Sequence, residues 1–195
     1  MTTRALSGAI AIWLVLVGAG GYAIYHYEAT AGAVATSGAT WPAGSALARA
    51  RDRPTVLMFA HPECGCTAAS LAELAIAVDA AAAPPRVLVV FVGAFSDAAL
   101  AASDNWTAAG RITGAIRIHV AGGPAGEARR FGARTSGHVA VYDARGALVF
   151  SGGITGARGH AGDNVGRRAV IAALRGAASA PAVHAVFGCS LEDAS

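Results

Sequence analysis

The sequence contains no lysine: all 15 of its basic residues are arginine, and 12 acidic residues leave a formal net charge of +3. Charged residues make up only 14% of the chain. The arginines are scattered along it and do not form a basic stripe interleaved with aromatic residues. A nucleic-acid-binding protein needs such a concentrated basic surface. We therefore expect no nucleic-acid partner.

Cysteine is also scarce, with three residues in a chain of 195. Small disulfide-stabilised scaffolds carry a dense set of cysteines, so this chain does not belong to that class. Cys64 and Cys66 stand close together, and Cys189 is left over if those two pair. In an oxidising compartment such a close pair can form a disulfide and be used chemically.

No charged residue occurs between Gly8 and Tyr25. Roughly 20 apolar residues span a bilayer, so this run is long enough for one pass. Arg4 is the only charge before the run, which favours an N-terminus on the cytoplasmic side. We expect residues 1–27 to anchor the chain in the inner membrane, through residues 8–25, with the remainder on the periplasmic side.

A cleaved signal peptide is the alternative for this segment, because small residues such as Ala29, Ala31 and Ala33 suit a cleavage site. The chain is exported under either interpretation. Residues 28–44 are rich in small residues and are expected to form a linker. The main domain is then expected over 45–178, followed by a C-terminal tail over 179–195.

Short apolar runs alternate with helical patterns along the main domain. The predicted strands cover residues 54–60, 86–92, 115–120, 138–142 and 147–151. The predicted helices cover residues 65–82, 96–109, 124–131 and 163–177, with Ser96 and either Asp163 or Asn164 as N-caps. Residues 143–146 form the predicted turn of a hairpin. This order predicts an α/β fold, with a central mixed sheet flanked by helices.

Cys64 and Cys66 lie where the first predicted strand passes into the first predicted helix. Unpaired N–H groups and the positive end of the helix dipole favour a thiolate there. Cys64 is the expected nucleophile, and Cys66 is close enough to resolve a mixed disulfide. A Cys-Gly-Cys disulfide is strained relative to the usual Cα separation of roughly 5.5–6 Å, which predicts an oxidising couple.

Other polar residues are expected at the same edge of the sheet, because the predicted topology returns the chain there repeatedly. The expected lining residues are His61, Thr67, Gly137, His138, Arg158 and His160. For the histidines and the arginine, an ordinary structural role is the alternative. Cys189 is a candidate resolving thiol or metal ligand, and burial as a small apolar residue is the alternative.

This order of elements, with a cysteine pair at the end of the first strand, resembles the thioredoxin superfamily over residues 45–178. Phe59 stands five residues before Cys64, as a phenylalanine does in that family. The segment Glu127–Ala133 resembles the family's helix that ends in Phe-Gly-Val. The segment Gly137–Gly146 resembles its hairpin, which opens with a cis-proline.

The resemblance is nearest to membrane-anchored extracytoplasmic proteins of the TlpA/ResA-like or RedB-like kind. It implies a thioredoxin-like fold and thiol–disulfide exchange with exported proteins, reset by a redox partner protein and needing no cofactor. Two positions depart from the family pattern. Thr67 stands in place of the second cysteine of Cys-x-x-Cys, and Gly137 stands in place of the cis-proline. These departures put ordinary disulfide reductase activity in doubt.

Two interpretations from other classes remain open. Cys64, Cys66 and a histidine (His138, or else His61 or His160) could hold copper, because thiolates select soft ions. That arrangement is similar in logic to Sco-type copper chaperones, although their wider cysteine spacing is not reproduced. The other interpretation is a redox-inactive scaffold that binds a partner protein.

Overall fold

The computed structural model describes residues 3–35, 37–120, 126–177 and 182–191, and the chain divides into two compact units, Met1–Thr30 and Ala31–Ser195. The first unit is the helix α1 (Thr3–Ala29). Its apolar part, Leu6–Ala29, has 24 residues. At 1.5 Å per residue this part is about 36 Å long, and a bilayer core is about 30 Å thick. By length and composition α1 can cross a membrane, although a signal sequence passes the same test.

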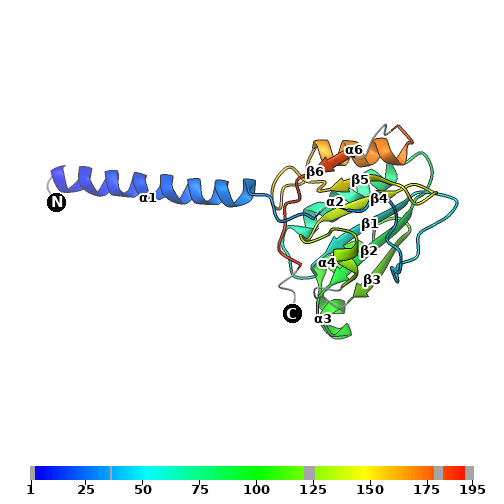
Figure 1. The fold of residues 1–195 in the computed structure, drawn as a ribbon. Coiled ribbons are helices and arrows are strands. Elements are labelled where there is room, and N and C mark those ends of the chain that lie inside the picture. Colours follow the sequence, from blue (N-terminus) through cyan, green and yellow to red (C-terminus); the bar gives the residue numbers. More distant parts are fainter. Residues whose placement is uncertain (1–2, 36, 121–125, 178–181, 192–195) are drawn as a thin grey trace. The chain divides into compact units, whose positions relative to one another are not determined.

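The second unit is a mixed α/β domain built on a six-stranded sheet of order β3-β2-β1-β4-β5-β6 (Figure 1). The strands are β1 (Thr55–Ala60), β2 (Arg86–Val92), β3 (Ala115–Val120), β4 (His138–Tyr142), β5 (Leu148–Gly152) and β6 (Ala182–His184). β1, β2 and β3 are mutually parallel. β4 pairs antiparallel with both β1 and β5, and β6 pairs parallel with β5. The predicted mixed sheet is therefore confirmed.

Helices cover both faces of the sheet. They are α2 (Thr67–Asp79), α3 (Asp97–Ala102), α4 (Asp104–Ala109), α5 (Glu127–Arg130) and α6 (Val165–Leu174). α2, α3, α4 and α6 contribute to the apolar core on one face, where Leu74, Phe91 and Phe150 are fully buried. α5 lies on the other face, whose core includes Phe59 and Tyr142. Every residue of β1 is buried, as expected for a strand covered on both sides.

The helix predicted over residues 96–109 is interrupted at Ser103 and forms α3 and α4. The Ser103 hydroxyl oxygen accepts a hydrogen bond from the Trp106 N–H (3.2 Å) and caps α4. Ser96 caps α3 as predicted, by accepting from the Ala99 N–H. Asn164 caps α6 by accepting from the Arg167 N–H (2.8 Å), so α6 begins two residues later than predicted. The same capping chemistry acts at all three positions, and the cap at Ser103 was not predicted.

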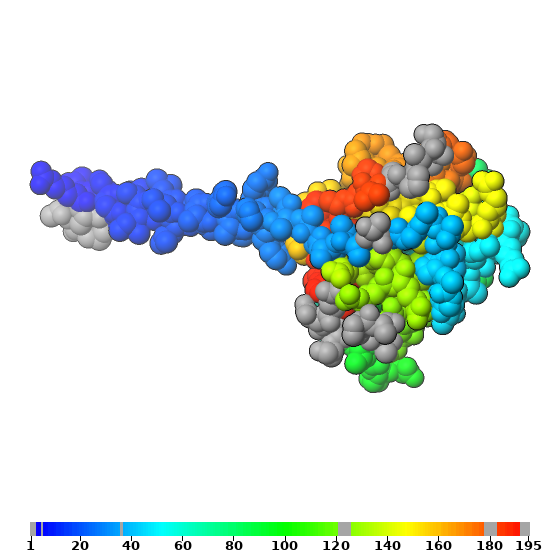
Figure 2. All heavy atoms as spheres, in the orientation of Figure 1, coloured from blue at the N-terminus to red at the C-terminus, as the bar shows by residue number. Residues whose placement is uncertain are grey.

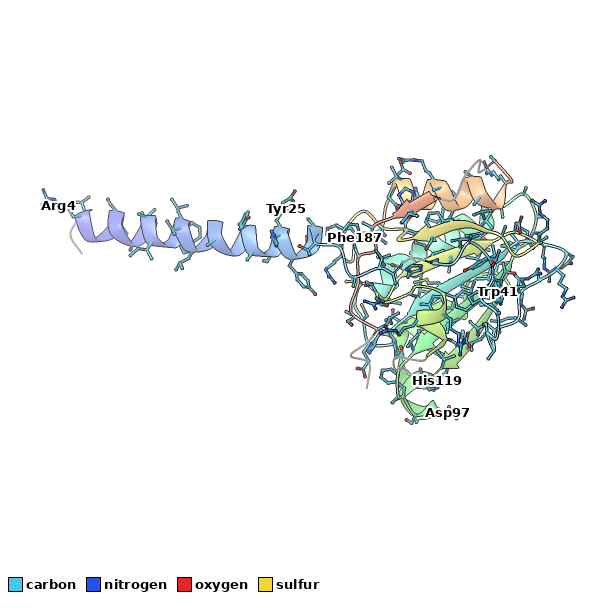
Figure 3. The ribbon with its side chains drawn as sticks, viewed as in Figure 1. Arg4, Tyr25, Trp41, Asp97, His119 and Phe187 are labelled. Carbon is cyan, nitrogen blue, oxygen red and sulfur yellow. The ribbon has the colours of Figure 1, made fainter. Side chains whose placement is uncertain are left out.

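The segment predicted as a linker over residues 28–44 packs in part against the domain. The N–H of Trp41 donates to the carbonyl of Gly146 (2.8 Å), and Thr40 forms a β-bridge with Ala147. The Trp41 ring, labelled in Figure 3, meets Phe131 and Tyr142 edge-on at centroid distances of 5.0 and 5.1 Å. The linker prediction is therefore wrong for these residues, because their apolar and hydrogen-bonding groups complete the sheet's second face.

The C-terminal tail is also part of the domain. β6 extends the sheet by pairing Phe150 with Ala182 and Gly152 with His184. The N–H of Gly32 then donates to the carbonyl of Val186 (2.8 Å), so residues near both ends of this unit lie side by side. In Figure 2 the red C-terminal segment accordingly lies against the light-blue residues that follow residue 30. Residues 182–191 are thus more than the appendage expected from the sequence.

Candidate functional site

The cysteine turn joins the carboxyl end of β1 to the start of α2. The Cys64 N–H donates to the His61 carbonyl (3.3 Å), and the Thr67 N–H donates to the Cys64 carbonyl (3.0 Å). Cys66 is the N-cap residue of α2, and its side chain makes no capping bond. Asn105 of α4 donates from Nδ2 to the Cys64 carbonyl (3.0 Å). The turn is therefore fixed by its own backbone and by α4.

The C-terminal tail brings Cys189 to this turn. The Ser136 N–H donates to the Cys189 carbonyl (2.8 Å), and the Leu191 N–H donates to the Arg134 carbonyl (2.8 Å). Gly188 packs so closely that an added Cβ would lie 2.0 Å from the Ser136 carbonyl oxygen. Phe187, labelled in Figure 3, marks where the tail enters this region. All three cysteines are free thiols here.

Hydrogen bonds stabilise the thiolate form of Cys64. Burial by itself raises the pKa of this thiol, but four hydrogen bonds outweigh it and hold the pKa below its ordinary value. The donors are the thiol and backbone N–H of Cys189, the hydroxyl of Thr67 and the backbone N–H of Cys66. Donors aimed at a sulfur favour its charged form. Cys64 is thus the thiol that loses its proton first.

The other two thiols are held protonated. Burial raises the pKa of Cys66, and the charge of Cys64 and a hydrogen bond with it raise it further. Burial and the same two effects of Cys64 raise the pKa of Cys189 to about 12. The guanidinium of Arg158 opposes these shifts at both thiols. The three sulfurs and Arg158 therefore form one electrostatic cluster.

The three thiols differ in their exposure to solvent. Cys64 is only 2% exposed, whereas Cys66 and Cys189 are partly exposed. The Cys64 thiol is covered in part by its hydrogen-bonding neighbours, including Cys189.

An open cleft of ≈ 540 Å³ reaches the cysteine turn from the side of α3 and α4. Its lining residues are Pro62, Glu63, Cys64, Gly65, Ala68, Ala99, Ala102, Ser103, Asp104 and Asn105. Ser103 and Asn105 both donate to the Pro62 carbonyl, at 2.8 and 2.9 Å, and hold this wall of the cleft in place. The cleft gives a small or extended substrate an approach to the Cys64 residue.

Ser136 links three parts of the site and was missed by the sequence reasoning. Its hydroxyl shares a hydrogen bond with Thr67 Oγ1 (2.8 Å) and accepts from the His61 N–H (2.9 Å), and its own N–H holds Cys189. The Thr67 hydroxyl therefore contacts the loop before β4 as well as its own turn, where its oxygen lies 3.3 Å from the His61 carbonyl oxygen. A lone serine before a glycine carries no sequence signal for such a role.

Gly137 occupies a position that other residues tolerate poorly. Its φ is +90°, and an added Cβ would lie 2.8 Å from Ser70 Oγ of α2. Its N–H donates to the Phe59 carbonyl (2.8 Å), which a proline at this place would lack. No cis peptide bond occurs in the described residues. Glycine thus lets the loop pass close to α2 while keeping the strand hydrogen bond.

His138 lies on the other face of the sheet from α2. It pairs with Phe59 across β1 and β4, its ring meets that of Phe59 edge-on, and Nε2 lies 3.1 Å from Ser151 Oγ. Burial lowers the pKa of this imidazole to about 4. The expectation that His138 lines the cysteine site is therefore wrong: strand alternation turns it away.

His61 is half-buried at the edge of the turn, where its ring meets Phe95 edge-on at 5.2 Å. Burial lowers the pKa of this imidazole, and the neighbouring charge of Glu63 raises it in part. Its Nδ1 accepts a hydrogen bond from the Glu63 N–H (3.2 Å). His61 thus shapes the backbone of the turn.

Arg158 reaches the site from the glycine-rich loop after β5. Its guanidinium donates to the Gly188 carbonyl and to the Cys66 sulfur, so it joins the tail to the cysteine turn. His160 of the same loop is exposed, and its Nδ1 lies 2.8 Å from the Arg158 carbonyl oxygen. The structure thus brings Arg158 to the cysteines and leaves His160 at the surface.

A buried ion pair anchors the loop that carries Arg158. Glu73 of α2 is 1% exposed and pairs with Arg167 of α6 at 2.7 Å. The Gly162 N–H donates to Glu73 Oε1 (2.6 Å), and Asn164 Nδ2 donates to the Ile154 carbonyl (2.8 Å). This network ties both ends of the loop to α2 and α6, and neither charge was recognised from the sequence.

The donor set for copper is not assembled in the described part of the chain. No group of three or more His, Cys, Asp and Glu side chains there is arranged to hold a metal ion. Cys64 and Cys66 lie in the turn after β1. The His138 side chain lies on the face of the sheet that carries Phe59, away from α2. The residues chosen for copper from the sequence therefore do not converge.

Comparison with known proteins identifies a fold and no family. No protein-family model matches the chain, and no curated protein matches it. A hypothetical protein, SMc02350 from Sinorhizobium meliloti 1021, is similar in structure, with 17% identity, a TM-score of 0.53 and coverage of 85% of this chain and 97% of that one. An uncharacterized conserved protein from Geobacillus kaustophilus has 18% identity, a TM-score of 0.50 and coverage of 84% and 92%. At these identities the likeness concerns the fold alone.

Proposed function

We propose that this protein carries out thiol–disulfide exchange through Cys64, on a thioredoxin-like domain anchored to the inner membrane and facing the periplasm. The observation that carries the proposal is the set of four hydrogen bonds that stabilise the Cys64 thiolate. A thiolate, and not a thiol, attacks a disulfide. A neighbouring thiol then displaces the substrate sulfur.

The surrounding fold supports the thioredoxin-like assignment. The cysteine turn stands at the carboxyl end of β1, between two parallel neighbours on one side and an antiparallel hairpin on the other. The loop before that hairpin contacts the turn through Ser136 and contacts β1 through Gly137, as the resemblance to the superfamily implies. Substrates would be exported proteins with thiols or disulfides, and a separate redox protein would reset the pair.

The reaction of the reduced, full-length protein with glutathione disulfide tests the proposal. Cys64 should acquire glutathione or enter an internal disulfide much faster than free cysteine does at the same pH, because a larger share of it is thiolate. Mass spectrometry of alkylated peptides identifies the modified residue. Failure of Cys64 to react while the protein is folded would contradict the proposal.

The membrane orientation gives a separate prediction. A reporter that is active only in the periplasm should be active when fused after Ser195, and a reporter that is active only in the cytoplasm should not. The reason is the single charge, Arg4, before the apolar run of α1. The reverse pattern of reporter activity would contradict the proposed orientation. The mass of the mature protein distinguishes an intact anchor from a cleaved signal.

A further inference from the structure

We propose that Cys189 is the resolving thiol of this site, so that the protein cycles between three thiols and a Cys64–Cys189 disulfide. This inference rests on the proposed exchange function and adds the residue that completes it. The sequence alone favours Cys66 for this role, because Cys66 is nearest along the chain. The contacts of the tail favour Cys189.

Cys189 is held against Cys64 by contacts on both sides of the tail. Both its thiol and its backbone N–H donate hydrogen bonds to the Cys64 sulfur. Its carbonyl accepts from the Ser136 N–H at 2.8 Å, and the carbonyl of the preceding Gly188 accepts from Arg158. The tail is therefore positioned by the same residues that build the site, and the Cys189 sulfur is already next to the sulfur it would attack.

Cys66 is less suited to the same step. It lies two residues from Cys64 at the N-cap of α2, with φ −73° and ψ −20°. A disulfide between Cys64 and Cys66 would close a small ring around Gly65, and disulfides need a particular separation and direction of their Cβ atoms. A bridge from Cys64 to Cys189 joins two segments far apart in the sequence and closes no such local ring. The Cys66 thiol also forms a hydrogen bond with Cys64, so the ring geometry, and not proximity, separates the two candidates.

Electrostatics gives the two sulfurs an order of reaction. Burial raises the pKa of Cys189 most, a hydrogen bond with Cys64 and the charges of Cys64 and Cys66 raise it further, and Arg158 lowers it. Once Cys64 has formed a neutral mixed disulfide, its charge no longer opposes ionisation of Cys189, and Arg158 still favours it. Cys189 thus stays protonated until Cys64 has reacted and loses its proton more readily afterwards.

The reaction consists of two successive thiol–disulfide exchange steps. The Cys64 thiolate attacks one sulfur of a substrate disulfide, forms a mixed disulfide and releases the other substrate sulfur as a thiolate. Cys189 gives its proton to solvent and attacks the Cys64 sulfur. The Cys64–Cys189 bond forms as the remaining substrate sulfur leaves as a thiolate. The substrate disulfide gains two electrons, which the two protein thiols supply, and the reverse sequence oxidises a substrate dithiol.

Peptide mapping of the full-length protein in detergent tests this assignment. The reduced wild type, Cys66→Ser and Cys189→Ser proteins are each treated with glutathione disulfide, alkylated and digested with trypsin without reduction. Cleavage after Arg51, Arg86 and Arg175 leaves Cys64 and Cys66 together on peptide 52–86 and Cys189 on peptide 176–195. A link between Cys189 and the turn therefore appears as a joined pair of peptides.

The expected result is a joined pair in the wild type and in Cys66→Ser, and its loss in Cys189→Ser, where glutathione accumulates on Cys64. Cys189→Ala should behave like Cys189→Ser, which separates loss of the sulfur from an effect of the serine hydroxyl. Accumulation of glutathione in Cys66→Ser, with normal resolution in Cys189→Ser, would overturn the inference and make Cys66 the resolving thiol. Absence of any reaction at Cys64 in the folded wild type would instead overturn the proposed exchange function.

Discussion

The full-length protein with Cys64→Ser is expected to lose disulfide exchange completely. Serine keeps nearly the same shape at this position, but its hydroxyl does not ionise near neutral pH and does not exchange with disulfides. The two remaining thiols do not substitute for it, because burial, the largest cause of the raised pKa values of Cys66 and Cys189, persists when the Cys64 charge is removed. The measurement is the release of glutathione from glutathione disulfide by the reduced protein.

Cys66→Ser is the matched control for this experiment. It changes a cysteine of the same turn to the same residue, but it leaves the donors from Cys189, Thr67 and the Cys66 backbone in place at Cys64. Its first exchange step should therefore persist. Release of glutathione by Cys64→Ser at the wild-type rate would mean that another thiol carries the reaction, and would contradict the proposed role of Cys64.

Replacing Arg167 with Gln should destabilise the domain by roughly 3 kcal/mol, because it removes the charged partner of a buried carboxylate. Glu73 is 1% exposed, and among the residues that the structure describes its oxygens then keep only the Gly162 N–H and the Asn164 amide as donors. The measurement is the free energy of unfolding of the full-length protein in detergent. Unfolding by denaturant is monitored through the near-ultraviolet circular dichroism of the aromatic core.

Arg145→Gln is the control, because it makes the same substitution in an ion pair at the surface. Arg145 pairs with Asp143 at 3.3 Å, but its side chain is 91% exposed, so its loss should cost less than about 1 kcal/mol. The double variant Glu73→Leu with Arg167→Met should recover part of the lost stability, since no buried charge remains unpaired. Equal and small effects of Arg167→Gln and Arg145→Gln would show that the buried pair does not hold the loop of Arg158.

Local patterns in the sequence predicted the elements that build the centre of the sheet. β1 and β2 are continuous apolar runs, and both are buried as such runs require. The cysteine turn follows β1 because the apolar run stops at His61, and α2 follows because its apolar residues recur at helical spacing. The hairpin was predictable from Asp143 and Gly146, whose backbone groups close the turn at 2.9 Å.

Contacts between distant segments were not predictable in the same way. Ser136 meets Thr67 and Cys189 only because three separate chain segments converge, and no spacing within any one of them encodes this. β6 has only three residues, too short for a recognisable alternation. The topological expectation that the tail returns to the sheet edge did place Cys189 near the turn. It did not indicate which thiol Cys189 would contact.

His138 illustrates a different limit. The topology correctly brought the start of β4 beside the end of β1, where Gly137 contacts Phe59 and Ser70. The face on which the next side chain lies depends on the parity of the strand register, and a shift of one residue reverses it. His138 therefore shares a face with Phe59, away from α2, and a prediction based on proximity along the chain assigned it to the wrong side.

The pH dependence of iodoacetamide alkylation, resolved for each cysteine of the folded full-length protein by mass spectrometry, tests whether Cys64 is the nucleophile. The maximal rate depends on access to a sulfur, whereas the midpoint of the pH profile reports its ionisation. Because hydrogen bonds lower the pKa of Cys64, its midpoint should lie below the free-cysteine value of roughly 8.5 and below those of Cys66 and Cys189. A midpoint for Cys64 above those of the other two thiols would contradict the assignment of Cys64 as the nucleophile.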